Sequence, residues 1–350
     1  MSFIRAFVLG TVLVLGGLGC SSGGAAAQSG GSDTSPPNWF LNPDDAYSDA
    51  TYLTAVASGP SAQDAQSKAF GNLARVFEAD IEATKNLRDN YREVKKDGQV
   101  TSTQEESVLI TKSNVQSNQK LLNSEVLERA EAGGTFYALV GMKRQETVSI
   151  YAQEIESNRS KIENYRSAAG ETDSPITRLA FLQQALVLAK VNDRLVTQRN
   201  IVAGGSAPDQ SSSVTELRTA VRKAQKACPV IVQTGDEDIP PSIVDQVGAT
   251  LETAGFRVID RPGDAILEAL VKYRERPALE SREEEFLRWN LAIELTDQTT
   301  KQTLETFTTE RRAGGMSKAG VKRDAHNTAR RVIENEFSTF LDQTLLAIDQ

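Results

Sequence analysis

The sequence predicts an α+β protein: two α/β sandwich domains, with helices packed on mostly antiparallel sheets, joined by a helical hairpin after a signal peptide and flexible tether. Apolar residues alternate with polar ones over 265–273 and 287–295, as in half-buried strands. Over 148–196 they recur instead at helical spacing. We expect five segments in chain order: a signal peptide (1–19), a cysteine with a flexible tether (20–37), an α+β domain (38–147), a helical hairpin (148–203) and a C-terminal α+β domain (214–350).

Residues 1–19 have the order of a secretory signal peptide. A positive charge at Arg5 precedes an apolar stretch, and small residues follow that stretch. The uncharged run from Ala6 to Gly19 contains 14 residues. A helix needs about 20 apolar residues to cross a bilayer. We therefore expect the leader to be removed rather than kept as a membrane span.

The segment Gly17-Leu18-Gly19-Cys20 resembles the bacterial lipobox, in which a cysteine after small residues is acylated and becomes the new N-terminus. The resemblance implies a lipoprotein held on its membrane through Cys20, because two or three acyl chains, such as palmitate, anchor a protein stably. Gly17 stands where the family usually has leucine, so ordinary secretion with cleavage near Ala25 to Ala27 stays open as an alternative. Ser21 replaces the aspartate of inner-membrane retention, which implies the periplasmic face of the outer membrane.

A polar tether follows the cysteine. From Ser21 to Pro37 the chain is rich in Gly, Ser and Ala and shows no apolar periodicity. Such a coil has a root-mean-square span of roughly 20–25 Å. We expect it to hold the folded part clear of the lipid headgroups.

The segment 38–147 combines strand and helix signals. A strand is expected at Tyr52–Val56, ending at Gly59, and Ser61 with Asp64 three residues later predicts a capped helix. Further strands are expected at Val108–Ile110, Leu122–Leu127 and Phe136–Gly141. One helix covering an antiparallel sheet is the simplest arrangement.

Four features of this segment occur in a characteristic order: Pro37-Asn38-Trp39-Phe40 with Asn42-Pro43, the strand Tyr52–Val56, the Ala-rich helix from Ser61 to Phe77, and the closing strand Phe136–Val140. In that order they resemble the twenty-kilodalton bacterial outer-membrane lipoprotein family, whose domain is also similar to the N-terminal part of the flagellar assembly protein T family. The resemblance covers about 37–147 and implies a periplasmic binding or assembly module without shared catalytic residues. Residues 80–105 depart from it by being unusually polar.

The connector is expected to be an antiparallel helical hairpin. Apolar residues from Val148 to Ala169 fall on one seam, with Asn158 on the same seam, and Gly170 is expected to end the first helix. Ser174-Pro175 starts a second helix, as expected for a cap followed by proline. We interpret the hairpin as a packed connector, with an exposed coiled-coil docking surface as the alternative.

The C-terminal segment 214–350 begins with a helix, a strand, a helix and a second strand, which is βαβ-like. Two alternating strands, a turn at Asp297–Lys301, a third strand near 303–309 and a long final helix follow. This order, with Ala254-Gly255-Phe256-Arg257-Val258, resembles the N-terminal domain of TolB, the curli-secretion lipoprotein and the lipoprotein activators of penicillin-binding proteins. Fold likeness alone does not establish a function.

Residues that could carry chemistry are few. The chain has one histidine, His326, which we expect to be solvated or to cap a helix. Cys228 is expected to be a buried apolar residue rather than a nucleophile. The acids Asp236-Glu237-Asp238 are interpreted as favouring the start of the following helix rather than binding calcium. Glu283-Glu284-Glu285 is interpreted as part of a salt-bridged face opposite Arg274 or Arg276.

We therefore expect no catalytic, cofactor or metal site, and one modified residue, Cys20. The formal net charge of −8 argues against nucleic acid as a partner, because phosphate binding needs a dense basic face. The function we expect is that of a non-catalytic, periplasm-facing lipoprotein that binds or positions another cell-envelope protein. The alternative is a regulator that activates a cell-wall synthase. The sequence leaves the oligomeric state open.

Overall fold

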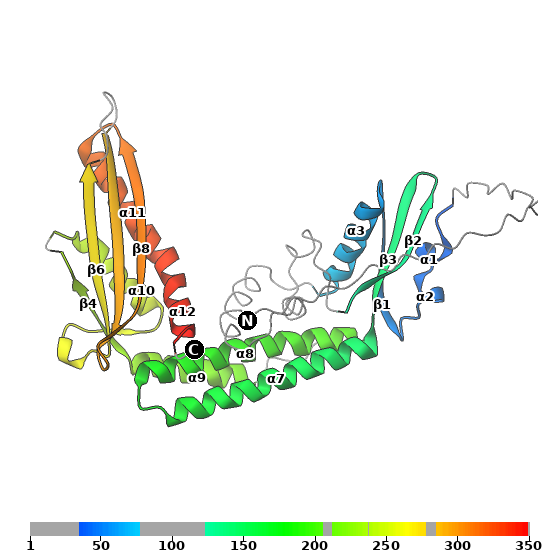
Figure 1. Ribbon diagram of the computed structural model, residues 1–350, viewed down its shortest axis with the longest axis horizontal. Helices are drawn as coiled ribbons and strands as arrows, with labels where there is room; N and C mark the ends of the chain where they lie inside the picture. Colours follow the sequence, from blue (N-terminus) through cyan, green and yellow to red (C-terminus); the bar gives the residue numbers. More distant parts are fainter. Residues whose placement is uncertain (1–34, 78–122, 206–211, 237, 278–284, 349–350) are drawn as a thin grey trace, which may run out of the picture.

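Two β-sheets stand at opposite ends of a long pair of helices, and both rise on the same side of it (Figure 1). The computed structural model describes residues 35–77, 123–205, 212–236, 238–277 and 285–348. The fold is α+β, as the sequence predicts. The expected signal peptide, Cys20 and almost all of the tether lie outside the described residues.

The N-terminal lobe is a three-stranded antiparallel sheet in the order β1-β3-β2. Its elements are α1 (Asn38–Leu41), α2 (Pro43–Ala46), β1 (Tyr52–Gly59), α3 (Ala62–Arg75), β2 (Glu125–Ala132) and β3 (Thr135–Lys143). The Ser61 hydroxyl accepts a hydrogen bond from the Asp64 backbone N–H at 3.1 Å, which confirms the predicted cap. Ala65 and Ala69 are fully buried, so α3 lies close against the sheet.

The prediction of a strand at Leu122–Leu127 is wrong in its position, since β2 begins at Glu125 and runs to Ala132. Gly133 and Gly134 both have positive φ, and they form the tight turn that joins β2 to β3. Charged residues of β2, such as Glu128 and Glu131, interrupt the apolar pattern by which a strand is predicted from sequence. The strand expected at Val108–Ile110 and the polar segment 80–105 lie outside the described residues.

The connector consists of two helices of 28 residues each, α7 (Arg144–Glu171) and α8 (Pro175–Val202). Each is about 42 Å long at 1.5 Å per residue. The predicted seam is confirmed: Tyr151, Ile155 and Asn158 are buried on α7. Gly170 lies one residue inside α7 rather than ending it, and Ser174 caps α8 by accepting from the Thr177 N–H.

The helix α8 is buried on all sides from Gln184 to Ala189. It packs against α7, against α9 (Ser212–Lys226) and against the last helix of the chain. A helix that is buried all round belongs to a core rather than to a surface. The buried apolar residues form one connected cluster that runs from α3 through this hairpin to the C-terminal sheet.

The C-terminal lobe is a five-stranded sheet in the order β5-β4-β6-β7-β8. Its strands and helices are β4 (Pro229–Thr234), α10 (Pro241–Thr253), β5 (Arg257–Val258), β6 (Leu267–Pro277), β7 (Glu285–Asp297), β8 (Gln302–Gly315), α11 (Lys318–Val332) and α12 (Ser338–Leu346), with a short turn η1 (Pro262–Asp264). The strand β4 runs parallel to β5 and β6, which gives the predicted βαβ-like unit, and the other pairs are antiparallel.

The buried residues of β6 and β7 are odd-numbered and lie on the side of the sheet that α11 covers, and the even-numbered residues face the opposite side. On the helix side, Trp289, Leu291 and Ile293 are each at most 1% exposed. The third strand is longer than the expected 303–309, because charged residues after Thr309 continue the pairing up to Gly315. The expected final helix contains a π-helical turn, η2 (Ile333–Phe337), which turns Ile333 and Phe337 into the core.

Candidate functional site

The predicted lipidation site, Cys20, lies outside the described residues, so its acylation stays a prediction. Among the described residues no helix is long and apolar enough to span a membrane. The features of the described chain that bear on function are the joints that hold the two lobes on the hairpin and the surfaces that the lobes expose.

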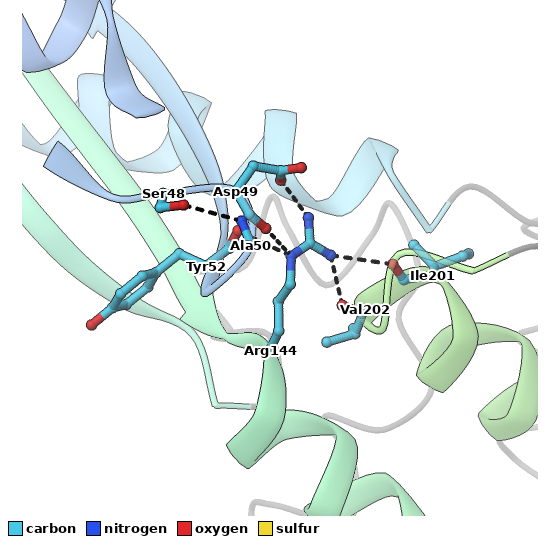
Figure 2. A network of polar contacts seen from close by, with 7 residues as sticks. All are labelled: Ser48, Asp49, Ala50, Tyr52, Arg144, Ile201 and Val202. Atoms are coloured by element: carbon cyan, nitrogen blue, oxygen red, sulfur yellow. Dashed lines mark hydrogen bonds and ion pairs between the residues drawn. The ribbon is translucent and has the colours of Figure 1, made fainter. Parts of the chain in front are cut away.

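The joint of the N-terminal lobe is built around Arg144, the first residue of α7 (Figure 2). Its guanidinium donates to the Val202 carbonyl at 2.6 Å and to the Ile201 carbonyl at 3.5 Å, at the end of α8. It also donates to the Tyr52 carbonyl at 3.2 Å and the Asp49 carbonyl at 2.6 Å, and it pairs with the Asp49 carboxylate. One side chain therefore ties together β1, the start of α7 and the end of α8.

This arrangement follows from the chemistry of helix ends. The last carbonyls of α8 have no partner inside the helix, and a cation near them is favoured by the helix dipole. The guanidinium has five N–H donors in a fixed plane, so it can satisfy carbonyls on several segments at once. Since the Arg144 side chain is only 13% exposed, these bonds are poorly replaced by water.

The joint of the C-terminal lobe is the buried amide of Gln184 on α8. Its Nε2 donates to the Leu346 carbonyl at 2.9 Å and to the Ile348 carbonyl at 3.4 Å, where α12 ends. Gln184 is 1% exposed. Arg178 closes the turn of the hairpin by donating to the Ala169 and Thr172 carbonyls at 3.0 and 2.6 Å. Polar bonds to helix ends thus fix both lobes and the turn.

The expectation of a solvated or capping His326 is wrong. Its Nε2 lies 2.7 Å from Glu275 Oε1, its side chain is 22% exposed, and its ring meets Tyr273 edge-on at 5.9 Å. The Tyr273 hydroxyl donates to the same carboxylate oxygen at 3.1 Å, and Lys322 lies 3.6 Å from the other oxygen. Burial and the neighbouring Glu275 raise the pKa of Tyr273. This cluster ties α11 to β6.

Of the acids expected to favour the start of α10, Asp236 has another role, and Glu237 lies outside the described residues. The cap residue of α10 is Pro240, and no side chain caps the helix. Asp236 instead pairs with Arg274 at 3.0 Å. The strand register places Asn290 opposite Arg274 and Arg288 opposite Arg276, while Glu283 and Glu284 lie outside the described residues, so the expected face of Glu283-Glu284-Glu285 stays a prediction for those two acids. Of the three acids only Glu285 is described, and it lies 4.0 Å from Lys318.

Cys228 is a core residue, as predicted. It is fully buried, and burial raises the pKa of its thiol to about 12. A thiol in this state is a poor nucleophile. Within the described ranges no group of three or more His, Cys, Asp or Glu side chains could hold a metal ion.

An aromatic layer covers the sheet face of the N-terminal lobe that is opposite α3. Phe40 meets Tyr137 edge-on at 4.8 Å, and Tyr47 meets Tyr52 at 5.2 Å. The Tyr47 hydroxyl donates to Glu128 at 2.9 Å. The short helices α1 and α2 are thereby attached to the sheet. Leu41, at the end of α1, is 61% exposed.

The sequence reasoning missed Arg144 and Gln184. The signal for Gln184 was present, because a glutamine in the middle of a helix that is otherwise apolar on all sides must find a partner. Arg144 gave no such signal, since the chain has 39 Lys and Arg residues and its partners are mostly backbone carbonyls.

No family model and no curated protein sequence matches the chain. Solved structures resemble it at low identity. A secreted protein of Helicobacter pylori is 12% identical, covers 81% of this chain and 97% of its own, and has a TM-score of 0.39. A minor lipoprotein of Acinetobacter baumannii is 13% identical over 35% of this chain and 92% of its own, with a TM-score of 0.25. The rare lipoprotein B of Shewanella oneidensis is 12% identical over 32% of this chain and 90% of its own, with a TM-score of 0.24. Bacterial lipoproteins are thus among the proteins to which this chain is similar.

Proposed function

We propose that the protein is a non-catalytic bacterial lipoprotein, anchored through Cys20 on the periplasmic face of the outer membrane, that binds or assembles another cell-envelope protein. The anchor rests on the lipobox-like segment and on the short leader. The binding role rests on the shape of the described chain. Its two sheets are held apart by one hairpin (Figure 1).

The observation that carries the binding role is the pair of polar joints. The Arg144 joint fixes the N-terminal sheet to the hairpin, and Gln184 fixes the end of α12 to the same hairpin. A flexible linker would suffice to keep two independent domains in one chain. Buried bonds of this kind serve instead to hold two surfaces at a set separation, which benefits a protein that must contact a partner at two places.

The non-catalytic role is supported by the way in which the ionisable groups are used. The imidazole of His326 and the phenol of Tyr273 both form hydrogen bonds with the Glu275 carboxylate, between α11 and β6. The Cys228 thiol is buried with a raised pKa. A general base or nucleophile needs access to a substrate, and these groups are occupied with packing contacts.

Membrane fractionation tests the anchor. We expect the wild-type protein in the membrane fraction with an intact mass that corresponds to cleavage before Cys20 plus acyl chains. The Cys20→Ser variant should be released from the membrane. Cys228→Ser is the matched control, since it removes the other cysteine and should leave the protein in the membrane. An unacylated mass that begins at or after Ala25 would contradict the anchor.

Photo-crosslinking in cells tests the binding role. A photoreactive residue at Thr308 on the C-terminal sheet or at Glu131 on β2 should capture a defined envelope protein, identified by mass spectrometry. Exposed Glu163 on α7 is the control position and should capture nothing. Capture of a cell-wall synthase would establish the alternative role as its regulator. Equal yields from all three positions would contradict a role for the lobes.

A further inference from the structure

Three arginines stand side by side on the face of the C-terminal sheet that is opposite its helices. Arg276 on β6 lies directly opposite Arg288 on β7, and Arg288 lies directly opposite Arg312 on β8. Directly paired residues point to the same face of a sheet, with strands about 4.8 Å apart. All three side chains are exposed. We call this set the arginine row.

The arginine row is unfavourable for the fold by itself, because like charges directly opposite one another destabilise a sheet. The chain neutralises it only in part. Arg288 lies 3.3 Å from Glu310, but the two side chains are 61% and 55% exposed, so water screens the pair. Arg276 makes no ion pair with any residue that the structure describes. Within the described part of the chain, ion pairing therefore adds little to the stability of the fold at the row.

The end of the row at Arg312 is held in place by an aromatic ring. The Arg312 guanidinium lies 3.9 Å from the centre of the Phe286 ring. The ring lies over Gly314, where an added Cβ would come within 2.7 Å of it. A glycine at this position gives the ring room to lie flat on the sheet, and the ring in turn supports the guanidinium. A cation held in this way loses less entropy when it binds an anion.

We propose that the arginine row binds an acidic segment of a protein partner through guanidinium–carboxylate pairs. This inference rests on the proposed function and specifies the chemistry of the partner. Each guanidinium can take a carboxylate in bidentate fashion, and the strand spacing presents three such positions in a line. An extended acidic segment that crosses the strands can reach all three.

The surroundings of the row favour a peptide over a membrane surface. Lys272 and Arg274 share the face of the row, but they pair with Glu294 and Asp236, which leaves fewer free cations than the about four to eight of a lipid-binding cluster. The face that carries this row also carries Glu294 and Glu310, and Asp236 pairs with Arg274 beside it. A uniform layer of anionic headgroups would also lie against these acids and be repelled by them. A peptide can place its carboxylates at the arginines and its neutral residues elsewhere.

Fluorescence anisotropy with a labelled decaglutamate peptide tests the proposal, using the full-length protein in detergent. The variant Arg276→Gln/Arg288→Gln/Arg312→Gln removes the row. The matched control, Arg222→Gln/Arg323→Gln/Arg331→Gln, removes the same charge from exposed positions on α9 and α11. We expect the row variant to bind at least about tenfold more weakly than wild type, which is 1.4 kcal/mol, and the control to stay within about twofold. The melting temperature of a single variant, Arg276→Gln, should be equal to that of wild type or higher, because Arg276 makes no ion pair with a described residue and faces Arg288.

Several results would overturn the proposal. An equal loss of decaglutamate affinity in both variants would show a general effect of charge. If the wild-type protein did not bind decaglutamate at all, an acidic segment could not be the ligand of the row. Row-dependent binding of inorganic phosphate or of phosphatidylglycerol vesicles that is tighter than that of decaglutamate would assign the row to phosphate groups instead. A lower melting temperature of Arg276→Gln alone would show that acids of the same chain use the row. None of these results affects release by Cys20→Ser or crosslinking from β2, so a failure here is distinguishable from a failure of the proposed function.

Discussion

The two lobes are stabilised in different ways. The C-terminal sheet buries large side chains against its helices, among them Trp289, Phe337 and Leu291. The N-terminal sheet packs on α3 through small residues such as Ala65 and Ala69, and its attachment to the hairpin depends on the hydrogen bonds of Arg144.

This difference separates two tasks. Burial of apolar area supplies most of the stability of a lobe but is non-directional. Hydrogen bonds from a planar guanidinium add less free energy but define an orientation. We infer that the C-terminal lobe is a stable unit through its core, and that the N-terminal lobe keeps its position through Arg144.

The largest expected effect is in the C-terminal core. Phe337→Ala leaves a cavity beside Phe307 and Phe340, and should destabilise the lobe by about 3–5 kcal/mol. A Trp39→Phe background leaves buried Trp289 as the tryptophan that reports unfolding in urea. Amide exchange of β1 in the N-terminal lobe should change far less. Equal destabilisation of both lobes would contradict the view that they are stabilised in different ways.

A smaller and more local effect is expected at the N-terminal joint. Arg144→Met keeps the apolar stem but removes the guanidinium donor to the carbonyls of Tyr52 and Val202, at a cost of about 1–3 kcal/mol, whereas Ile201 keeps its bond from the Gly204 N–H. Hydrogen exchange should speed up in β1 and at the end of α8, while β7 stays protected. Lys143→Met at the exposed neighbouring position is the control. Unchanged exchange in β1 would contradict the role of Arg144.

The smallest effect is expected on the open face of the C-terminal sheet. A hydrogen bond from Lys272 and a weaker contribution from Thr303 lower the pKa of Glu294. Because its folded pKa lies below its unfolded value, the pair stabilises the fold above the unfolded pKa, and this contribution is lost as the pH falls through the folded pKa. Glu294→Gln should cost about 0.2–1 kcal/mol at pH 7 and almost nothing near pH 2. Denaturant titrations at both pH values measure this, and a pH-independent loss would assign it to packing.

Periodicity made much of the fold predictable. Alternation identified β6 and β7, and helical spacing identified the hairpin with Asn158 inside it. Features that depend on register or on distant contacts were not predictable. His326 and Glu275 are 51 residues apart, and the arginine row exists only because β6, β7 and β8 pair in one particular register. The joint at Arg144 could not be predicted, because backbone carbonyls carry no sequence signal.

The central claim is that the hairpin holds the two lobes at a fixed separation, and a spin-label distance measurement tests it most directly. Exposed Lys68 on α3 and Arg323 on α11 can each be replaced by a labelled cysteine in a Cys20→Ser background. Buried Cys228 should stay unlabelled, because its thiol pKa is raised to about 12. We predict one narrow distance distribution that broadens in Arg144→Met. A broad distribution in the protein with Arg144 intact would contradict the claim.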